Sequence, residues 1–285
     1  MSRRDEILSV LREAQALPGG AASAVRLLQD PEADPREIVR ELERDVALTA
    51  NVLRVANSAV YGGTRKVATL RDALGRLGQA RVFQIVVAVA IGPTAGRPVK
   101  GYDLPAGKLW EHSLSVALGT GALAGQLELE EPRELFVAGL LHDVGKIFLG
   151  NFVEVDVAAL LDLAAREDLP FVEAERLLLG IAHPEVGAAL LEQWGLPEGI
   201  VEAARWHHEP ERCPRPSLVV DLVHLSDALS LAAGIGLGVD GLRARGSEEV
   251  ARRRGLDRRR AERAALGMMT AMAESGDVLS MGKER

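Results

Sequence analysis

The sequence predicts an all-α protein. Along most of its 285 residues the apolar side chains recur at the helical period, while the strict alternation of half-buried strands is rare. Glycine and proline divide these stretches into segments of ordinary helix length. With 47% hydrophobic residues, 26% charged residues and a formal net charge of −7, the composition is that of an ordinary globular protein and excludes disorder over most of the chain.

The N-terminal elements follow from local signals. At Asp34-Pro35-Arg36-Glu37, Asp caps, Pro suits the first turn and Glu completes a capping-box pattern, so a helix begins there. A second apolar stripe runs from 47 to 59, where the cluster Tyr61-Gly62-Gly63 stops the helix, and a third runs from 70 to 78. The stretch RVFQIVVAVAIG that follows (81–92) fits either a buried helix or a strand, and we interpret it as a helix.

The residues from Pro93 to Leu104 are typical of a connector, because two Pro and two Gly stand among polar side chains. We therefore predict an N-terminal helical subdomain over 1–100, a helical bundle over 101–240 and an Arg-rich helical tail over 241–285. The helices predicted after the connector are 109–127, 133–149, 154–166, 173–179, 184–194, 197–207 and 217–232.

Several classes of protein are disfavoured. The single Cys213 excludes an internal disulfide framework. The N-terminus has no continuous apolar core of a signal peptide, and the longest apolar run is shorter than a membrane span, so we expect a cytoplasmic protein without a membrane segment. A pI near 5.5 makes nucleic acid an unlikely partner. Residues 243–263 carry nine Arg against four acids, and we favour a solvated helix face over an anion-docking patch.

The chemically informative residues all follow the connector. In LLHDVGK an apolar helix turns polar at His142-Asp143, and a buried pair of this kind needs hydrogen-bond partners or a metal. Further polar side chains of the same kind lie on or beside successive predicted helices. The whole set is His112, His142, Asp143, His183, His207, His208 and Asp227.

These five imidazoles and two carboxylates could converge inside one bundle and hold more than one metal. Nitrogen and oxygen donors suit iron, manganese, nickel or zinc, and the lack of thiolates argues against a structural zinc or iron–sulfur site.

The order H…HD…H…HH…D, with Lys146 shortly after the HD pair, resembles the HD metal-dependent phosphohydrolase superfamily. Its HD-GYP and HDOD branches are the most similar. The stretches DVALTANVLRVANSAVYG and TLRDALGRLGQARV resemble the N-terminal half of HDOD domains, and KLWEHSLSVA, FVAGLLHDVGKIFL and VHLSDALS add to the match over roughly residues 10–235. The resemblance implies a bacterial signal-transduction module in which an HD-like bundle follows a smaller helical subdomain.

For the site, the resemblance implies two divalent metal ions, with iron or manganese favoured and zinc or nickel as alternatives. Asp143 would bridge them; His112, His142 and Asp227 would surround one, and His183, His207 and His208 the other. Asp143 and Lys146 would be the catalytic residues of a hydrolase, in which the metals activate water for attack on a phosphoester. Lys146 is equally well explained as a surface lysine.

Two functions stay open. Many HDOD members lack the ligands and act as output modules, and no Gly-Tyr-Pro motif follows His208 here. We therefore expect an output domain that binds a nucleotide ligand or a signalling protein partner. The alternative is a metal-dependent phosphohydrolase or phosphodiesterase acting on a nucleotide or cyclic nucleotide, which the complete ligand set favours. We expect structural roles for Asn57-Ser58 and no ligand role for His224.

Overall fold

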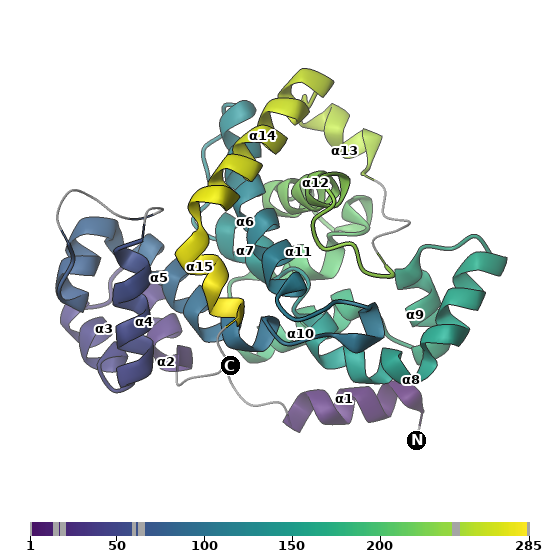
Figure 1. Cartoon of the computed structure of the whole chain (residues 1–285), viewed down its shortest axis with the longest axis horizontal. Coiled ribbons are helices and arrows are strands. Elements are labelled where there is room, and N and C mark those ends of the chain that lie inside the picture. The colour runs from purple at the N-terminus through teal and green to yellow at the C-terminus, as the bar shows by residue number, and fades with distance from the viewer. Residues whose placement is uncertain are drawn as a thin grey trace.

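The structure is a computed structural model that describes residues 2–13, 17, 21–58, 61, 66–240 and 246–283. It is built from helices (Figure 1). Within the described ranges the only β pairing is an isolated antiparallel bridge between Val99 and Leu104. The predicted all-α fold is confirmed.

The N-terminal helices α2 (Ala21–Gln29), α3 (Pro35–Leu42), α4 (Val46–Ala56) and α5 (Leu70–Ala95) pack against one another as a separate group. Asp34 caps α3 by accepting a hydrogen bond from the backbone N–H of Arg36 at 2.8 Å. The group forms the left-hand part of Figure 1. Its helices bury their apolar faces against the long helix α5.

Helix α5 contains the stretch that the sequence left between helix and strand, and the predicted helix is confirmed. It bends at Gly78, whose φ of 76° lies in the left-handed region. The helix also continues through Pro93 to Ala95, so the predicted start of the connector at Pro93 is wrong. Proline removes only its own N–H donor, and the N–H of Gly96 still reaches the carbonyl of Gly92 at 2.8 Å.

Helix α1 (Arg3–Glu13) lies apart from the other N-terminal helices, along the lower edge of the molecule in Figure 1. It contacts the second part of the chain: Arg3 forms an ion pair with Asp156 at 3.0 Å, and its guanidinium lies 5.3 Å from the ring centroid of Phe152. The predicted division near residue 100 stays a prediction. In space, however, α1 joins the bundle.

The bundle contains α6 (Lys108–Gln126), α7 (Leu135–Leu141), α8 (Gly145–Arg166), α9 (Phe171–Leu179), α10 (His183–Gln193), α11 (Glu198–Trp206) and α12 (Leu218–Ala232). The predicted helices 133–149 and 154–166 are wrong in their division. The chain breaks at 142–144, and one helix then runs on from 145 to 166. Gly145 begins the second helix in close contact with α10, and an added Cβ there would lie 2.0 Å from the carbonyl oxygen of His183.

The C-terminal helices α13 (Glu248–Arg253), α14 (Arg258–Glu274) and α15 (Gly276–Leu279), followed by the 3-10 turn η5 (Ser280–Lys283), return over α6 to α5 and α4. The indole N–H of Trp110 in α6 donates to the carbonyl of Val278 at 3.0 Å. The tail thereby contacts both the bundle and the N-terminal group.

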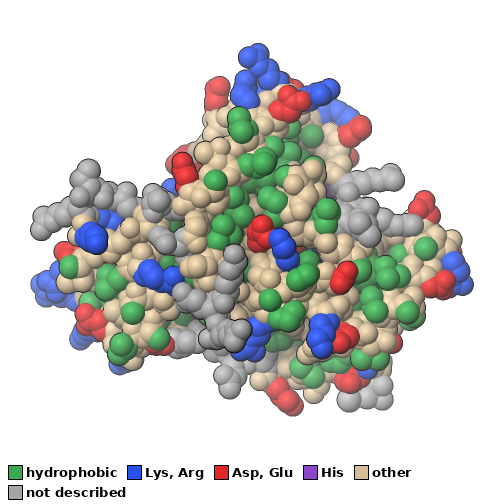
Figure 2. All heavy atoms as spheres, in the orientation of Figure 1, with side chains coloured by type: hydrophobic (Ala, Val, Ile, Leu, Met, Phe, Trp, Pro, Cys, Tyr) green, Lys and Arg blue, Asp and Glu red, His purple; other side chains and the backbone are tan. Residues whose placement is uncertain are grey.

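The Arg-rich tail uses several of its cations inside the molecule. Arg253 and Arg254 both form ion pairs with the fully buried Asp221, and Arg263 binds Gln126. At the top of Figure 2, where α13 and α14 lie, basic side chains are exposed with acidic side chains among them. These contacts support a structural and solvated role, while Arg243 and Arg245 lie outside the described residues.

Helix α5 is the one helix in the described ranges that is long and apolar enough to cross a membrane, and 56% of its most apolar window is buried within the protein. The core helices of globular proteins meet the same criterion, so this helix is weak evidence for a membrane span.

Candidate metal centre

The structure brings all seven predicted ligands together in the bundle, mostly from helix ends. His112 lies in α6 and Asp227 in α12. His142 ends α7, Asp143 follows it in the turn, and His183 begins α10. His207 and His208 follow α11. All are buried except His208, which is partly exposed.

One half of the centre is formed by His112, His142 and Asp227 with one oxygen of Asp143. Asp143 Oδ2 lies 3.5 Å from His112 Nε2 and 3.3 Å from His142 Nε2. Asp227 Oδ1 lies 3.2 Å and 4.0 Å from the same two nitrogens. These donor atoms face one another at separations that a single ion between them would produce.

The other half is formed by His183, His207 and His208 with the second oxygen of Asp143. Asp143 Oδ1 lies 3.5 Å from His183 Nε2 and 3.6 Å from His207 Nε2. His183 Nε2 lies 3.1 Å from His208 Nε2. Asp143 thus presents a different oxygen to each half, in the arrangement that a bridging carboxylate adopts between two metals.

Three atoms at the middle of the centre have no hydrogen-bond partner within the described part of the chain: His142 Nε2, Asp143 Oδ1 and His207 Nε2. A buried polar atom left without a partner costs roughly 1–3 kcal/mol. A divalent cation in each half would satisfy all three, so the residues present fit a metal site.

The outer nitrogens of the imidazoles fix the ring orientations. His142 Nδ1 lies 2.8 Å from the carbonyl of Gly139, and His207 Nδ1 lies 2.8 Å from that of Ala204. Because a carbonyl only accepts, each Nδ1 carries a proton, and the neutral form of each ring presents its Nε2 lone pair to the centre. His112 Nδ1 is held by the carbonyl of Ile235 at 3.2 Å.

The electrostatics also favour a cation. Burial would raise the pKa of Asp143, but the Lys146 ammonium and His142 hold it well below its usual range. Burial lowers the pKa of His207 to about 4, and burial together with His207 lowers that of His208 well below its usual value. At neutral pH these two imidazoles are therefore neutral, which is the form that binds metals.

Lys146 is not a surface lysine. Its side chain is buried, and its ammonium lies 2.5 Å from Asp143 Oδ2 and 2.6 Å from Asp240 Oδ2. Burial alone would lower the pKa of Lys146, but the two carboxylates raise it. The ammonium points to the centre, as the catalytic interpretation of Lys146 requires and the surface interpretation does not. The carboxylates of Asp143 and Asp240 already pair with its charge.

The sequence did not identify three residues of this region. Asp240, beyond the last predicted bundle helix, closes over Lys146, and Glu175 is fully buried beside His183. Gly236 has a φ of 77°, and an added Cβ would lie 2.4 Å from His112 Cβ, so only glycine fits there. Asp240 and Gly236 could not be found from their sequence separation from His142-Asp143. Their positions depend on how the loop after α12 folds back.

Two further expectations concern residues outside the centre. His224 has its Nδ1 2.6 Å from the carbonyl of His207, and its Nε2 accepts from the N–H of Ser247. Both ring nitrogens are thus occupied, as expected for a residue that is not a ligand. The Asn57 side chain bonds both backbone groups of Val67 and the carbonyl of Leu53, which confirms its structural role.

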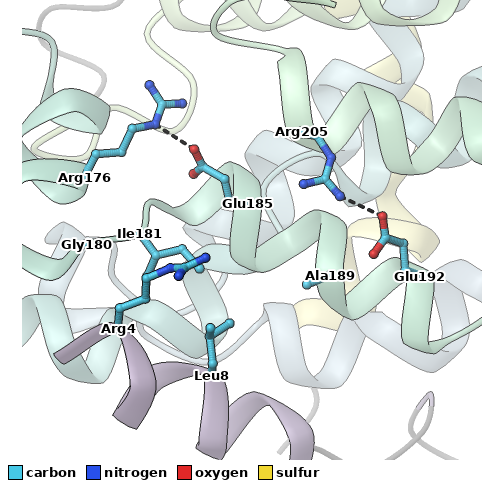
Figure 3. A pocket seen from close by; sticks show the side chains of 9 residues that line it. All are labelled: Arg4, Leu8, Arg176, Gly180, Ile181, Glu185, Ala189, Glu192 and Arg205. Atoms are coloured by element: carbon cyan, nitrogen blue, oxygen red, sulfur yellow. Dashed lines mark hydrogen bonds and ion pairs between the residues drawn. The ribbon is translucent and has the colours of Figure 1, made fainter. Parts of the chain in front are cut away.

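A surface cavity of about 540 Å³ lies between α1, α9, α10 and α11 (Figure 3). Arg176 pairs with Glu185 and Arg205 with Glu192 on its walls. Its lining includes none of the seven predicted ligands, although it comes close to the segment that carries His183. The cavity is therefore separate from the metal centre.

Comparisons with known proteins concern the fold and the family. An HDOD domain protein of unknown function from Geobacter sulfurreducens is 28% identical, with a TM-score of 0.71 over 99% of this chain and 96% of that one. A candidate phosphohydrolase from Shewanella amazonensis SB2B is 25% identical, with a TM-score of 0.70 over 97% of each chain.

Among curated relatives, Ribonuclease Y from Aquifex aeolicus (strain VF5) is 31% identical over 121 residues, which are 42% of this chain and 16% of that protein. The chain spans about 16% to 38% of the length of the curated relatives that it matches. The family model of the HDOD domain matches residues 15–210, well over half of the chain. The chain belongs to the HDOD domain family.

Proposed function

We propose that this chain is an HDOD signal-transduction module whose bundle binds two divalent metal ions and acts as an output domain for a nucleotide ligand or a signalling protein partner. The observation that carries the metal site is the set of three buried, unpartnered atoms on His142, Asp143 and His207, which face one another at its middle. A cytoplasmic location is part of the proposal.

When bound, two divalent ions supply Lewis acidity and lower the pKa of water. The chain's own residues would hold them in two sets that share Asp143: His112, His142 and Asp227 on one side, and His183, His207 and His208 on the other. Iron or manganese suits this donor set best. The contacts of the outer Nδ1 atoms hold a proton on that side of each ring, so that the inward Nε2 atom can bind a metal.

The closure of the centre supports an output role over rapid turnover. The ligands other than His208 are at most 5% exposed. Lys146, the cation that would hold a phosphate oxygen, is already paired with Asp143 and Asp240. A phosphoester would have to displace Asp240 before it could contact this ammonium.

A second candidate function is metal-dependent hydrolysis of a nucleotide or cyclic nucleotide. The complete ligand set favours it, as does the likeness to the candidate phosphohydrolase from Shewanella amazonensis SB2B. In that case Asp143 would hold the metals and Lys146 would orient the phosphate.

One experiment separates the two functions. Protein purified without oxygen or chelators is analysed for metals and then incubated with a panel of phosphoesters and cyclic nucleotides. The proposal expects about two divalent ions per chain, loss of the ion held by His112, His142 and Asp227 in His142→Ala, and little turnover. His224→Gln is the matched control, because His224 is buried in the same bundle but both of its ring nitrogens are bonded elsewhere.

Efficient hydrolysis that His142→Ala abolishes would replace the output role with the enzymatic one. Wild-type protein that takes up no metal even after reconstitution would contradict both functions.

A further inference from the structure

Glu175 is a fully buried carboxylate beside the metal centre, and it is not one of the proposed ligands. Its Oε2 accepts hydrogen bonds from the backbone N–H and from Nδ1 of His183, both at 2.9 Å. Its Oε1 accepts from the hydroxyl of Tyr102 at 2.5 Å. Every oxygen of the carboxylate is thus engaged, and two of its three hydrogen bonds hold His183.

This contact distinguishes His183 from the other proposed ligands. The Nδ1 atoms of His112, His142 and His207 lie against backbone carbonyls, whereas that of His183 lies against a carboxylate. A charged acceptor forms a stronger hydrogen bond than a neutral carbonyl, and it makes the far nitrogen a better donor to a metal. Glu175 should therefore strengthen metal binding in the half of the centre formed by His183, His207 and His208.

Tyr102 fixes the carboxylate from the opposite side. It lies in the short 3-10 turn η2 (Lys100–Tyr102) between α5 and α6, and it is fully buried. Its ring stands edge-on to that of His183 with the centroids 5.9 Å apart, and the Lys146 ammonium lies 5.7 Å from its centroid. Tyr102 therefore contacts the acid, the imidazole and the lysine of one side of the centre.

We propose that Glu175, held by Tyr102, is a positioning residue that fixes the tautomer of His183 and selectively strengthens metal binding in the half formed by His183, His207 and His208. The inference rests on the proposed function for its metal, while its claim about the tautomer stands on the hydrogen bonds alone. With Glu175 accepting from Nδ1, the proton stays there and Nε2 faces Asp143 and His208 with its lone pair.

The test measures Mn²⁺ affinity in two backgrounds that each retain one half of the centre. His112→Ala leaves the half that contains His183, and His208→Ala leaves the opposite half. Glu175→Gln should weaken Mn²⁺ binding by about 10–100-fold in the first background, the usual cost of losing an outer partner of a metal-bound histidine. In the second background the change should stay below about threefold. Tyr102→Phe should act in the same direction with a smaller effect.

The matched control is Glu167→Gln, which removes the same charge from an exposed position at the end of α8. It should leave Mn²⁺ binding unchanged in both backgrounds. An equal effect of Glu175→Gln in both backgrounds, or no effect in either, would overturn the proposal.

A second readout needs no metal. Imidazole ¹⁵N chemical shifts of the metal-free protein should show His183 protonated at Nδ1 in the wild type and in Glu167→Gln, with the Nε2–H form populated in Glu175→Leu, which removes the acceptor that an amide oxygen would keep. If the wild type takes up no Mn²⁺, the proposed two-metal function fails, and an unchanged His183 tautomer in Glu175→Leu would separately refute the positioning role. If the Glu175 variants do not fold, Tyr102→Phe tests the positioning role through Mn²⁺ affinity in the background that retains His183.

Discussion

The N-terminal group α2–α5 and the bundle α6–α12 bury very different side chains. Among the described residues of the N-terminal group, the buried polar side chains are Ser58 and Gln84, and neither is charged. The bundle buries an ammonium, several carboxylates and six imidazoles, five of them fully or nearly so. Burying a charge costs several kcal/mol unless it is paired. The bundle pairs most of these groups but leaves atoms of His142, Asp143 and His207 without a partner at the centre, while the N-terminal group is an ordinary apolar core.

The largest expected effect is on the metal content of the bundle, and it should follow substitution of Asp143. Because its two oxygens face the two halves of the centre, Asp143→Ala should abolish binding of both metals, with a loss of affinity above about 100-fold per site. Elemental analysis of the purified variant measures the loss. Retention of one metal at wild-type affinity would mean that Asp143 does not join the halves.

A matched pair of core truncations sharpens the comparison. Leu42 in the N-terminal group and Leu141 beside His142 are both fully buried. Each change to alanine should lower the free energy of unfolding by about 2–5 kcal/mol. Only Leu141→Ala should also weaken metal binding, because it loosens the turn that carries His142 and Asp143. Urea unfolding and metal titration measure the two effects; equal loss of metal in Leu42→Ala would show that the regions are not independent.

Acid should destabilise the metal-free bundle. Burial lowers the pKa of His207 to about 4 and lowers that of His208, so the unfolded chain binds more protons than the folded one at mildly acidic pH. This contribution is fully present above about pH 6.5 and is lost as the pH falls towards 4, at a cost of roughly 3 kcal/mol for His207. His142 acts in the opposite sense: burial would lower its pKa, but Asp143 and Asp227 raise it, so its contribution is lost as the pH rises.

Urea unfolding of chelator-treated protein across this range measures the slope. His207→Gln should flatten it. An identical slope in the variant would assign the acid sensitivity to other groups.

The smallest effect should come from a helix cap far from the centre. Asp34→Ala removes the acceptor of the Arg36 N–H at the start of α3 and should cost about 1 kcal/mol without changing metal content. Asp34→Asn keeps an acceptor and should restore most of the loss. Thermal unfolding resolves the difference, and a cost of zero in both variants would show that this cap does not contribute.

The local part of the fold could be predicted from the sequence. Helix caps such as Asp34, together with the glycine and proline residues that separate the apolar stretches, predicted most helix positions. These signals act within a few residues. The division of α7 from α8 was not predicted, because no proline interrupts LLHDVGKIFL. Gly145, which begins α8, packs against the backbone of His183, a residue far away in the sequence.

The candidate site divides in the same way. The structure brings the seven ligands together as the order of histidines and the family resemblance implied, while their binding of metal stays a prediction. Glu175 stands in an amphipathic helix where an acid is usually solvated, and its burial depends on Tyr102, 73 positions away. Asp240 becomes part of the site only because the loop after α12 folds back onto Lys146.

The most direct test of the two-metal centre is an anomalous difference map from crystals of the manganese-loaded protein. We expect two peaks, one among His112, His142 and Asp227 and the other among His183, His207 and His208, with Asp143 between them. The absence of both peaks in protein whose crystals contain Mn²⁺ elsewhere would contradict this expectation, as would a single peak away from Asp143.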